Sequence, residues 1–426
     1  MIGCLDNTNL VYLAFMIRLF IFVCLLSNAT CLLALDTIYV KPSAQADIER
    51  IIDHVPPHTI IKFAPGNYKI HDLIIRKPLT LYGIEQVVFD GQQLGSVLVL
   101  EGRNIHVKGL TIKNTGYSSV DERAGIKLLS AYGCIIEDVN IRNTCFGISL
   151  VNASNCVVIN NNIHAVGISE QRSGNAIHAW KSDSLTIKNN TVSGHRDGIY
   201  FEFVSKTGVY MNNSSDNLRY GIHFMFSNDD EYVGNVFDRN GSGVAVMFSS
   251  RVHIRDNTFS QGSGAANFGI LLKEINDCEV SGNTFRQNTN GLYMEGTNRV
   301  YLLHNLFTEN GWACRVQASC SSVIVRGNNF IGNSFDMATN GSLAGQNFNG
   351  NYWDTYSGYD MNKDGTGDIP HSPVSMYSMI VERMPYAIML YRSFTVFLLD
   401  RSERIMPGIT TEQVKDLKPA MQAFVL

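Results

Sequence analysis

The sequence predicts an all-β protein that winds into a right-handed parallel β-helix, a solenoid of short strands stacked coil on coil. Three segments that begin at Gly198, Gly221 and Gly243 align almost without gaps, with a spacing of 23 and then 22 residues. In each segment apolar residues alternate with variable ones, which is typical of a strand that buries one face. A repeat of this length with a strand in every unit indicates a solenoid, because each unit buries its apolar face only against its neighbours.

Two sequence marks recur through residues 125–350. The first is Gly before an aliphatic residue, at Gly125, Gly147, Gly198, Gly221, Gly243, Gly269 and Gly291. The second is Asn two residues before an apolar one, at Asn161, Asn190, Asn235, Asn257, Asn283, Asn305 and Asn328, and the unit at Asn213 breaks it with Ser215. Two marks per period require at least two strands per coil. Stacking of identical residues then predicts a hydrogen-bonded Asn ladder and an internal aromatic column, Phe237, Phe259, Phe285, Phe307 and Phe330.

Residues 1–35 are predicted to be a secretory signal peptide. Arg18 precedes the apolar run Leu19–Leu26, and small and mixed residues follow it. An apolar run of about 8 residues suits a signal peptide, whereas a membrane-spanning helix needs about 20. We therefore expect the mature protein to be exported.

Residues 36–70 are predicted to form an N-terminal cap. A strand at 37–40 and a short amphipathic helix at 46–53 would cover the open first coil. The parallel β-helix itself is expected over residues 71–353. The net charge of −4 argues against sequence-independent binding of nucleic acid.

The repeat stops after Trp353, and residues 354–375 contain an Asp-rich loop. It places oxygen ligands in the order of a calcium loop, with Gly at the turn position, through Asp360, Asn362, Asp364, Thr366 and Asp368. The bidentate Glu that normally ends such a loop is replaced by His371. A structural calcium site and a plain Asx-rich turn are the two interpretations.

Residues 376–426 form an apolar but interrupted tail. Glu382, Arg383 and Arg392 lie within it, together with Pro385. These residues make a membrane-spanning helix unfavourable. We interpret the tail as a docking segment or as a cap on the last coil.

The outward-facing residues of the aligned strands suggest a copper site. One predicted column contains His178, Tyr200, His223 and Ala245, and the next contains Trp180, Glu202, Met225 and Met247. Coils stack about 4.8 Å apart and residues i and i+2 lie about 6–7 Å apart, so a compact patch is expected on one outer wall. Imidazole and thioether groups suit Cu(I), and the predicted ligands are His178, Glu202, His223, Met225 and Met247. The alternative is an apolar contact patch in which Met serves as an adaptable residue.

A carbohydrate-active site is a second hypothesis, because His195, Arg196 and Asp197 lie at a coil corner near Glu202, with the acidic pair 229–230 one coil on. These residues could supply an acid, a base and a carboxylate-binding Arg. Nothing in the sequence makes them converge, and solvated charge at turns is the simpler interpretation.

Several blocks of the chain resemble the NosD-type maturation proteins of nitrous oxide reductase. They are Gly174–Trp180, His195–Glu202, Arg219–Met225, Gly243–Phe248, Gly350–Asp360, Leu390–Ser393 and Leu398–Arg401. The resemblance covers essentially the whole mature chain.

The resemblance implies a non-enzymatic, copper-binding β-helix protein of the periplasm. It implies work with the membrane subunit and the ATPase of an ABC transporter, which the tail would contact at the membrane. Copper would be a transient cargo, received from a copper-delivery chaperone and used to assemble the copper centres of apo nitrous oxide reductase. Copper, a sulfur species or both remain open as the cargo. The alternative class is a polysaccharide-modifying β-helix enzyme, such as a uronate epimerase, lyase or hydrolase.

Overall fold

The computed structural model describes residues 36–118, 120–167, 169–262, 267–343, 345–405 and 414–425. The signal peptide predicted for residues 1–35 lies outside the described residues. From Ile38 onward the chain forms one compact unit. Within the described part of the chain, every helix is too short or too polar to span a bilayer.

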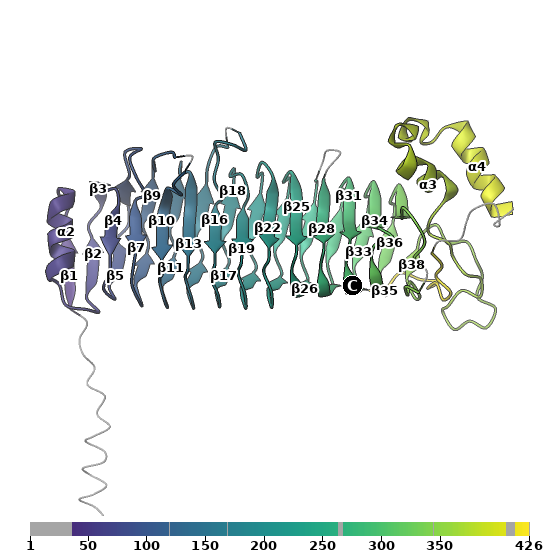
Figure 1. Cartoon of the computed structure of the whole chain (residues 1–426), viewed down its shortest axis with the longest axis horizontal. Coiled ribbons are helices and arrows are strands. Elements are labelled where there is room, and N and C mark those ends of the chain that lie inside the picture. Colours follow the sequence, from purple (N-terminus) through teal and green to yellow (C-terminus); the bar gives the residue numbers. More distant parts are fainter. Residues whose placement is uncertain are drawn as a thin grey trace, which may run out of the picture. The chain divides into compact units, whose positions relative to one another are not determined.

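The described residues build a β-helix of three long sheets, with one strand per coil in each sheet (Figure 1). The first sheet has 13 strands, in spatial order β1 (Thr37–Val40), β2 (Ile60–Phe63), β5 (Thr80–Gly83), β8 (His106–Lys108), β11 (Ile135–Glu137), β14 (Val157–Ile159), β17 (Thr186–Lys188), β20 (Gly208–Tyr210), β23 (Glu231–Val233), β26 (Ser250–Arg255), β29 (Asn276–Ser281), β32 (Asn298–Leu303) and β35 (Ser321–Arg326). The second sheet has 12 strands, β4 (Leu73–Ile75), β7 (Leu98–Leu100), β10 (Ala124–Leu129), β13 (Phe146–Val151), β16 (Ile177–Trp180), β19 (Ile199–Glu202), β22 (Tyr220–Met225), β25 (Ser242–Met247), β28 (Phe268–Lys273), β31 (Asn290–Glu295), β34 (Trp312–Val316) and β37 (Phe335–Ala338). The third sheet has 13 strands, β3 (Gly66–Lys69), β6 (Val87–Asp90), β9 (Thr111–Lys113), β12 (Asn140–Arg142), β15 (Asn162–His164), β18 (Thr191–Ser193), β21 (Asn213–Ser215), β24 (Val236–Asp238), β27 (Thr258–Ser260), β30 (Thr284–Arg286), β33 (Leu306–Thr308), β36 (Asn329–Ile331) and β38 (Tyr352–Trp353). Successive coils pair in parallel, so the predicted right-handed parallel β-helix is confirmed.

The predicted Asn ladder runs through the interior corner of the coils. Its members are Asn161, Asn190, Asn212, Asn235, Asn257, Asn283, Asn305, Asn328 and Asn351. From Asn161 to Asn328, each Nδ2 donates to the Oδ1 of the Asn one coil on, at 2.9–3.0 Å, and Asn351 ends the ladder. The predicted break at Asn213 is wrong by one residue, because Asn212 continues the ladder and Ser214 takes the inward position next to it.

The predicted aromatic column is also present and ends on a Trp. The rings of Phe285 and Phe307 stack at 4.5 Å, and Phe330 stacks on Trp353 at 4.1 Å. This column explains the repeated Gly, because a Cβ on Gly221 would lie 2.7 Å from the Phe237 ring. The recurring Gly and the recurring Phe therefore reflect the same packing requirement, because the Phe ring fills the space that a Cβ at the Gly position would need.

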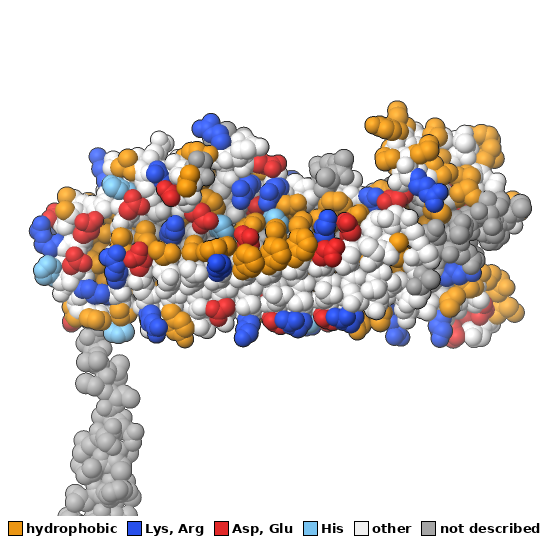
Figure 2. All heavy atoms as spheres, in the orientation of Figure 1, with side chains coloured by type: hydrophobic (Ala, Val, Ile, Leu, Met, Phe, Trp, Pro, Cys, Tyr) orange, Lys and Arg blue, Asp and Glu red, His pale blue; other side chains and the backbone are white. Residues whose placement is uncertain are grey.

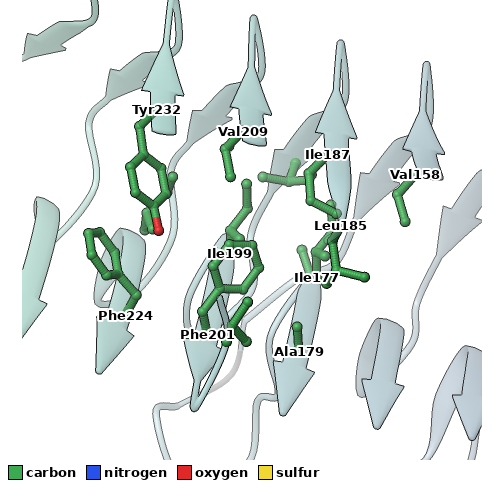
Figure 3. Close-up of a cluster of buried hydrophobic side chains, with 14 of the residues drawn as sticks. Val158, Ile177, Ala179, Leu185, Ile187, Ile199, Phe201, Val209, Phe224 and Tyr232 are labelled. Atoms are coloured by element: carbon green, nitrogen blue, oxygen red, sulfur yellow. The ribbon is translucent and has the colours of Figure 1, made fainter. Parts of the chain in front are cut away.

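The core lies between the sheets. In Figure 3 the inward side chains of β16, β19 and β22 face those of β14, β17, β20 and β23. Phe224 and Tyr232 stack there at 4.6 Å. Residues that alternate with these inward side chains along β16, β19 and β22 consequently lie on the outer wall.

The first coil begins earlier than predicted. Helix α2 (Gln45–His54) buries Ile48 and Ile52 at the N-terminal end of the core, as expected of the cap. Strands β2 and β3, however, already pair with β5 and β6. Coil-to-coil pairing is therefore already present before residue 71, and β1 extends the first sheet beyond β2.

The C-terminal region consists of two parts. Helix α3 (Met376–Arg383), the 3-10 helix η1 (Pro385–Leu390) and helix α4 (Phe394–Ile405) pack on Phe335 of the last coils. Residues 414–425 then return to the solenoid. The buried carboxylate of Asp416 accepts the backbone N–H of Asn351 and the indole N–H of Trp353, both at 2.9 Å. This C-terminal strap, residues 414–425, closes the last coil.

Candidate functional site

The two outward columns predicted on the second sheet are present in the strand register. His178 of β16 is aligned with Tyr200 of β19 and His223 of β22, followed by Ala245. The neighbouring column contains Trp180, Glu202, Met225 and Met247. The five predicted copper ligands therefore share one wall of the solenoid, which we call the site wall.

The two histidines of the site wall are not neighbours, however. The ring of Tyr200 lies between them, 5.0 Å from His178 and 5.1 Å from His223, edge to face in both cases. The Tyr200 hydroxyl donates to Glu202 at 3.3 Å. The histidines are 8% and 7% exposed, whereas Met225 and Met247 are half-buried. One ion held by both imidazoles is therefore excluded in this arrangement.

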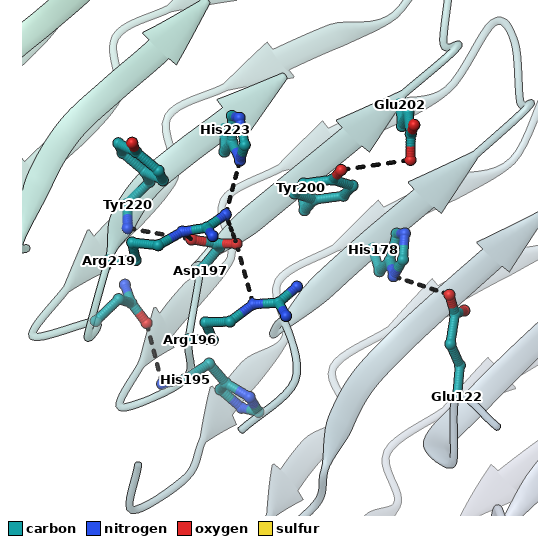
Figure 4. Close-up of polar contacts among 11 residues, drawn as sticks. Glu122, His178, His195, Arg196, Asp197, Tyr200, Glu202, Arg219, Tyr220 and His223 are labelled. Atoms are coloured by element: carbon teal, nitrogen blue, oxygen red, sulfur yellow. Dashed lines mark hydrogen bonds and ion pairs between the residues drawn. The ribbon is translucent and has the colours of Figure 1, made fainter. Parts of the chain in front are cut away.

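His178 is covered by a loop from an earlier coil (Figure 4). Its Nδ1 lies 3.4 Å from Oε1 of Glu122. Burial is the main cause that lowers the pKa of His178, so the ring is neutral near pH 7. Both ring nitrogens of His178 are buried and lack a hydrogen-bond partner among the described residues, so no hydrogen bond fixes the tautomer of this ring.

His223 belongs to a different network. Nη2 of Arg219 donates to Nδ1 of His223 at 2.9 Å, and the same guanidinium holds both oxygens of Asp197 at 3.1 Å. Asp197 is fully buried and also lies 3.5 Å from Nε of Arg196. Burial, and then the charges of Arg219 and Arg196, lower the pKa of His223 to about 4. The imidazole is therefore neutral under ordinary conditions.

The side chains of the site wall offer few ligands for a copper ion. Within the described residues, no three His, Cys, Asp or Glu side chains gather as metal ligands. A metal on the site wall would thus depend on the thioethers of Met225 and Met247, which lie on adjacent paired strands. This soft pair fits Cu(I).

The sequence indicates the residues around these histidines only weakly. The carbohydrate hypothesis names Arg196 and Asp197, and Asp197 does contact both Arg196 and Arg219, which in turn bonds His223. The acidic pair proposed with them is engaged elsewhere: Asp229 pairs with Arg251, and Asp230 accepts the N–H of Thr207. Glu122 gave no signal, because it reaches His178 from a loop far away in sequence.

The Asp-rich loop directs its carboxylates at its own backbone. Asp360 accepts the N–H of Lys363 at 2.6 Å and of Gly365 at 2.9 Å, and Asp368 accepts the N–H of Met361 at 2.7 Å. Asp364 likewise accepts from Thr366 and from the Asn362 side chain. These are the bonds of Asx turns. They give the predicted calcium site no support, and it stays a prediction.

A stack of exposed aromatic rings borders the methionines. Phe203, Phe226 and Phe248 follow the second sheet at the same corner of three coils, and their rings stack at 5.1 Å. They are 39–47% exposed. Figure 2 shows hydrophobic side chains in a band along the coils. The site wall therefore has an apolar border.

Comparison with known proteins gives a family match. The family model described as "Periplasmic copper-binding protein (NosD)" matches residues 160–358. The "Probable ABC transporter binding protein NosD" of Pseudomonas aeruginosa is 27% identical over 410 residues, covering 84% of this chain and 87% of that protein. Its namesake in Stutzerimonas stutzeri is 27% identical over 368 residues, covering 82% and 84%.

Solved structures share the fold alone. The surface adhesin PfbA of Streptococcus pneumoniae has a TM-score of 0.57 at 13% identity, covering 71% of this chain and 88% of that one. The A-module of the mannuronan C-5 epimerase AlgE6 of Azotobacter vinelandii has a TM-score of 0.53 at 15% identity, covering 73% and 95%. An adhesin and an epimerase on one fold carry no activity over to this chain.

Proposed function

We propose that this chain, which is similar to NosD proteins, is a non-enzymatic periplasmic accessory protein that binds copper and acts with an ABC transporter in the maturation of nitrous oxide reductase. Copper is its cargo. The observation that carries the copper part is the register that sets Met225 beside Met247, with His223 two residues away on the same strand. Turnover of uronate polymers by the purified protein would contradict the non-enzymatic assignment.

The site wall supports a transfer role rather than permanent storage. Met225, Met247 and Glu202 remain half-buried at the surface, so a partner can reach them. Thioether and imidazole ligands select Cu(I) over hard cations. The wall is thus suited to receive copper from a delivery chaperone and to pass it to the apo reductase.

The C-terminal helices support the contact with the transporter. Their exposed apolar side chains are Met384, Tyr386, Ile388, Met389, Leu390, Phe394, Phe397, Leu398 and Ile405. Figure 2 shows these hydrophobic side chains gathered over α3 and α4. An exposed apolar patch of this kind marks a protein or membrane contact. We assign it to the transporter's membrane subunit, through which the ATPase is coupled.

Copper binding is tested by replacing the three central residues of the wall. We expect the variant with Met225→Leu, Met247→Leu and His223→Gln to lose Cu(I) affinity by about tenfold or more, because both thioethers of the soft site are removed. The measurement is competition with a chromophoric Cu(I) chelator without oxygen. Met211→Leu, an exposed Met outside the wall, is the control. Unchanged affinity in the triple variant removes the site.

Transporter binding is tested on the helices without disturbing the strap. Phe394 and Phe397 are 73% and 60% exposed, so Glu at both positions leaves the fold intact. We expect the double variant to lose co-purification with the transporter, whereas Tyr301→Glu, an exposed position on the solenoid, keeps it. Retained association of the double variant would reject this assignment.

A further inference from the structure

The guanidinium of Arg219 is hydrogen-bonded to Nδ1 of His223, one of the predicted metal ligands. We infer that Arg219 is a gate on the site wall: while its guanidinium bonds Nδ1 of His223, this imidazole is closed to copper, and displacement of the guanidinium opens it. The inference rests on the proposed copper function and names the residue that regulates it.

The hydrogen bond fixes the position of the ring proton. A guanidinium donates hydrogen bonds and accepts none, so Nδ1 of His223 is the acceptor in the 2.9 Å contact with Arg219. A neutral imidazole has one N–H, which must then be at Nε2. Metals bind an unprotonated ring nitrogen. Both nitrogens of His223 are therefore occupied, one by the guanidinium and one by the proton.

Arg219 is held in this position from behind. Its Nε and Nη2 bond the two oxygens of Asp197, which has no exposed surface and also accepts the backbone N–H of Tyr220. The guanidinium carbon lies 5.0 Å from the centre of the Tyr220 ring. The side chain is nevertheless 33% exposed. A partner that offers a carboxylate can thus compete for the guanidinium from outside.

Nε2 of His223 is the group that would gain from such a change. It is buried and has no hydrogen-bond partner among the described residues. Once the guanidinium leaves, the proton exchanges through water from Nε2 to Nδ1, with no change in charge. The Nε2 lone pair then becomes available on the strand that also carries Met225.

His178 shows the opposite arrangement on the same wall. Its Nδ1 faces a carboxylate, Glu122, instead of a guanidinium, at 3.4 Å. Figure 4 shows the two histidines on either side of Tyr200 with these different partners. The two histidines of the wall therefore have different partners at Nδ1, a carboxylate and a guanidinium, and only His223 shares a strand with Met225.

The experiment separates the tautomer from the copper affinity. In protein with ¹⁵N-labelled histidine, long-range ¹H–¹⁵N spectra without copper show which nitrogen of His223 is protonated, assigned with His223→Gln. Cu(I) affinity is measured by chelator competition for the wild type, Arg219→Met and Arg219→Met with Asp197→Asn. The double variant removes the buried carboxylate of Asp197 together with Arg219, its main partner. It therefore controls for misfolding caused by an unpaired buried charge in Arg219→Met. Arg196→Met is the matched control, because Arg196 contacts Asp197 but not His223.

We expect an Nε2–H tautomer in the wild type. Both Arg219 variants should bind Cu(I) more tightly by about tenfold or more, because a charge-assisted hydrogen bond to His223 no longer competes with the metal. Adding His223→Gln should cancel that gain. An Nδ1–H tautomer in the wild type, or no gain in either Arg219 variant when the wild type binds Cu(I), rejects the gate alone. Absence of Cu(I) binding in every protein rejects the gate together with the proposed function.

Discussion

Replacing Asn257 by Ala tests the Asn ladder in the middle of the solenoid. Oδ1 of Asn257 accepts the backbone N–H of Asn235 at 2.8 Å and its Nδ2 at 2.9 Å. Nδ2 of Asn257 donates to Oδ1 of Asn283 at 3.0 Å and to the carbonyl oxygens of Arg255 and Tyr232 at 2.8 and 2.9 Å. The three Asn side chains are buried. The substitution removes these five contacts and leaves the N–H of Asn235 without its acceptor and away from water.

The expected loss of stability follows from these contacts. A buried donor left unpaired costs about 1–3 kcal/mol, and each further hydrogen bond contributes about 1 kcal/mol net. One orphaned backbone N–H and the lost bonds of three side-chain N–H groups, two of Asn257 and one of Asn235, therefore lower the free energy of unfolding by about 4–6 kcal/mol. Asn276→Ala, at an exposed Asn, should stay within about 0.5 kcal/mol of the wild type.

Urea unfolding followed by circular dichroism measures the difference between these variants. Because each coil of a solenoid contacts mainly its neighbours, hydrogen exchange should show the loss concentrated in the coils around Asn235 and Asn283. A loss below about 1 kcal/mol for Asn257→Ala would refute the view that the ladder holds the coils together.

Three further outcomes follow from burial and backbone geometry. Phe285→Ala should lower the free energy of unfolding by about 3–5 kcal/mol in urea titrations, because its ring is fully buried and stacked on both sides; a loss below about 1 kcal/mol would contradict the column's role. Phe226→Asn should change the unfolding free energy by less than about 1 kcal/mol, since this Phe is 39% exposed and adopts a left-handed φ of 50° that Asn tolerates; a loss as large as that of Phe285→Ala would disprove this. Burial raises the pKa of Asp230 from 3.8 to about 8. The neutral carboxyl therefore contributes fully to stability below pH 3.8, the pKa of the unfolded chain, and this contribution is lost as pH rises through 8. Asp230→Asn should remove that decline between about pH 4 and pH 8 in unfolding experiments, and parallel curves for the two proteins would reject the assignment.

The coil register could be predicted because stacking leaves the sequence little freedom. A Cβ on Gly221 would collide with the Phe237 ring, so the Gly mark and the aromatic column have to recur together. Once that period is known, the alignment of His178, His223 and Met247 on one wall follows from strand alternation alone. The register at Asn213 was missed by one residue, because no Phe marks the inward position of that coil and Ser214 fills it.

The partners of the site histidines could not be predicted from the repeat. Glu122 approaches His178 from a loop outside the strand pattern, and Arg219 reaches His223 through side-chain directions that spacing does not determine. The return of the strap to the last coil depends on Asp416, a single carboxylate in a segment without periodicity. The repeat period determines which residues lie on the site wall, whereas individual hydrogen bonds determine which of their side chains can bind a ligand.

The C-terminal strap has a consequence for self-association. Parallel solenoids can elongate like fibrils when an exposed terminal strand templates the edge of another molecule. Here Ala420 pairs with Tyr352 of the last coil, and helix α2 covers the core at the opposite end. The core is therefore covered at both ends, which disfavours lengthwise templating of one molecule by another.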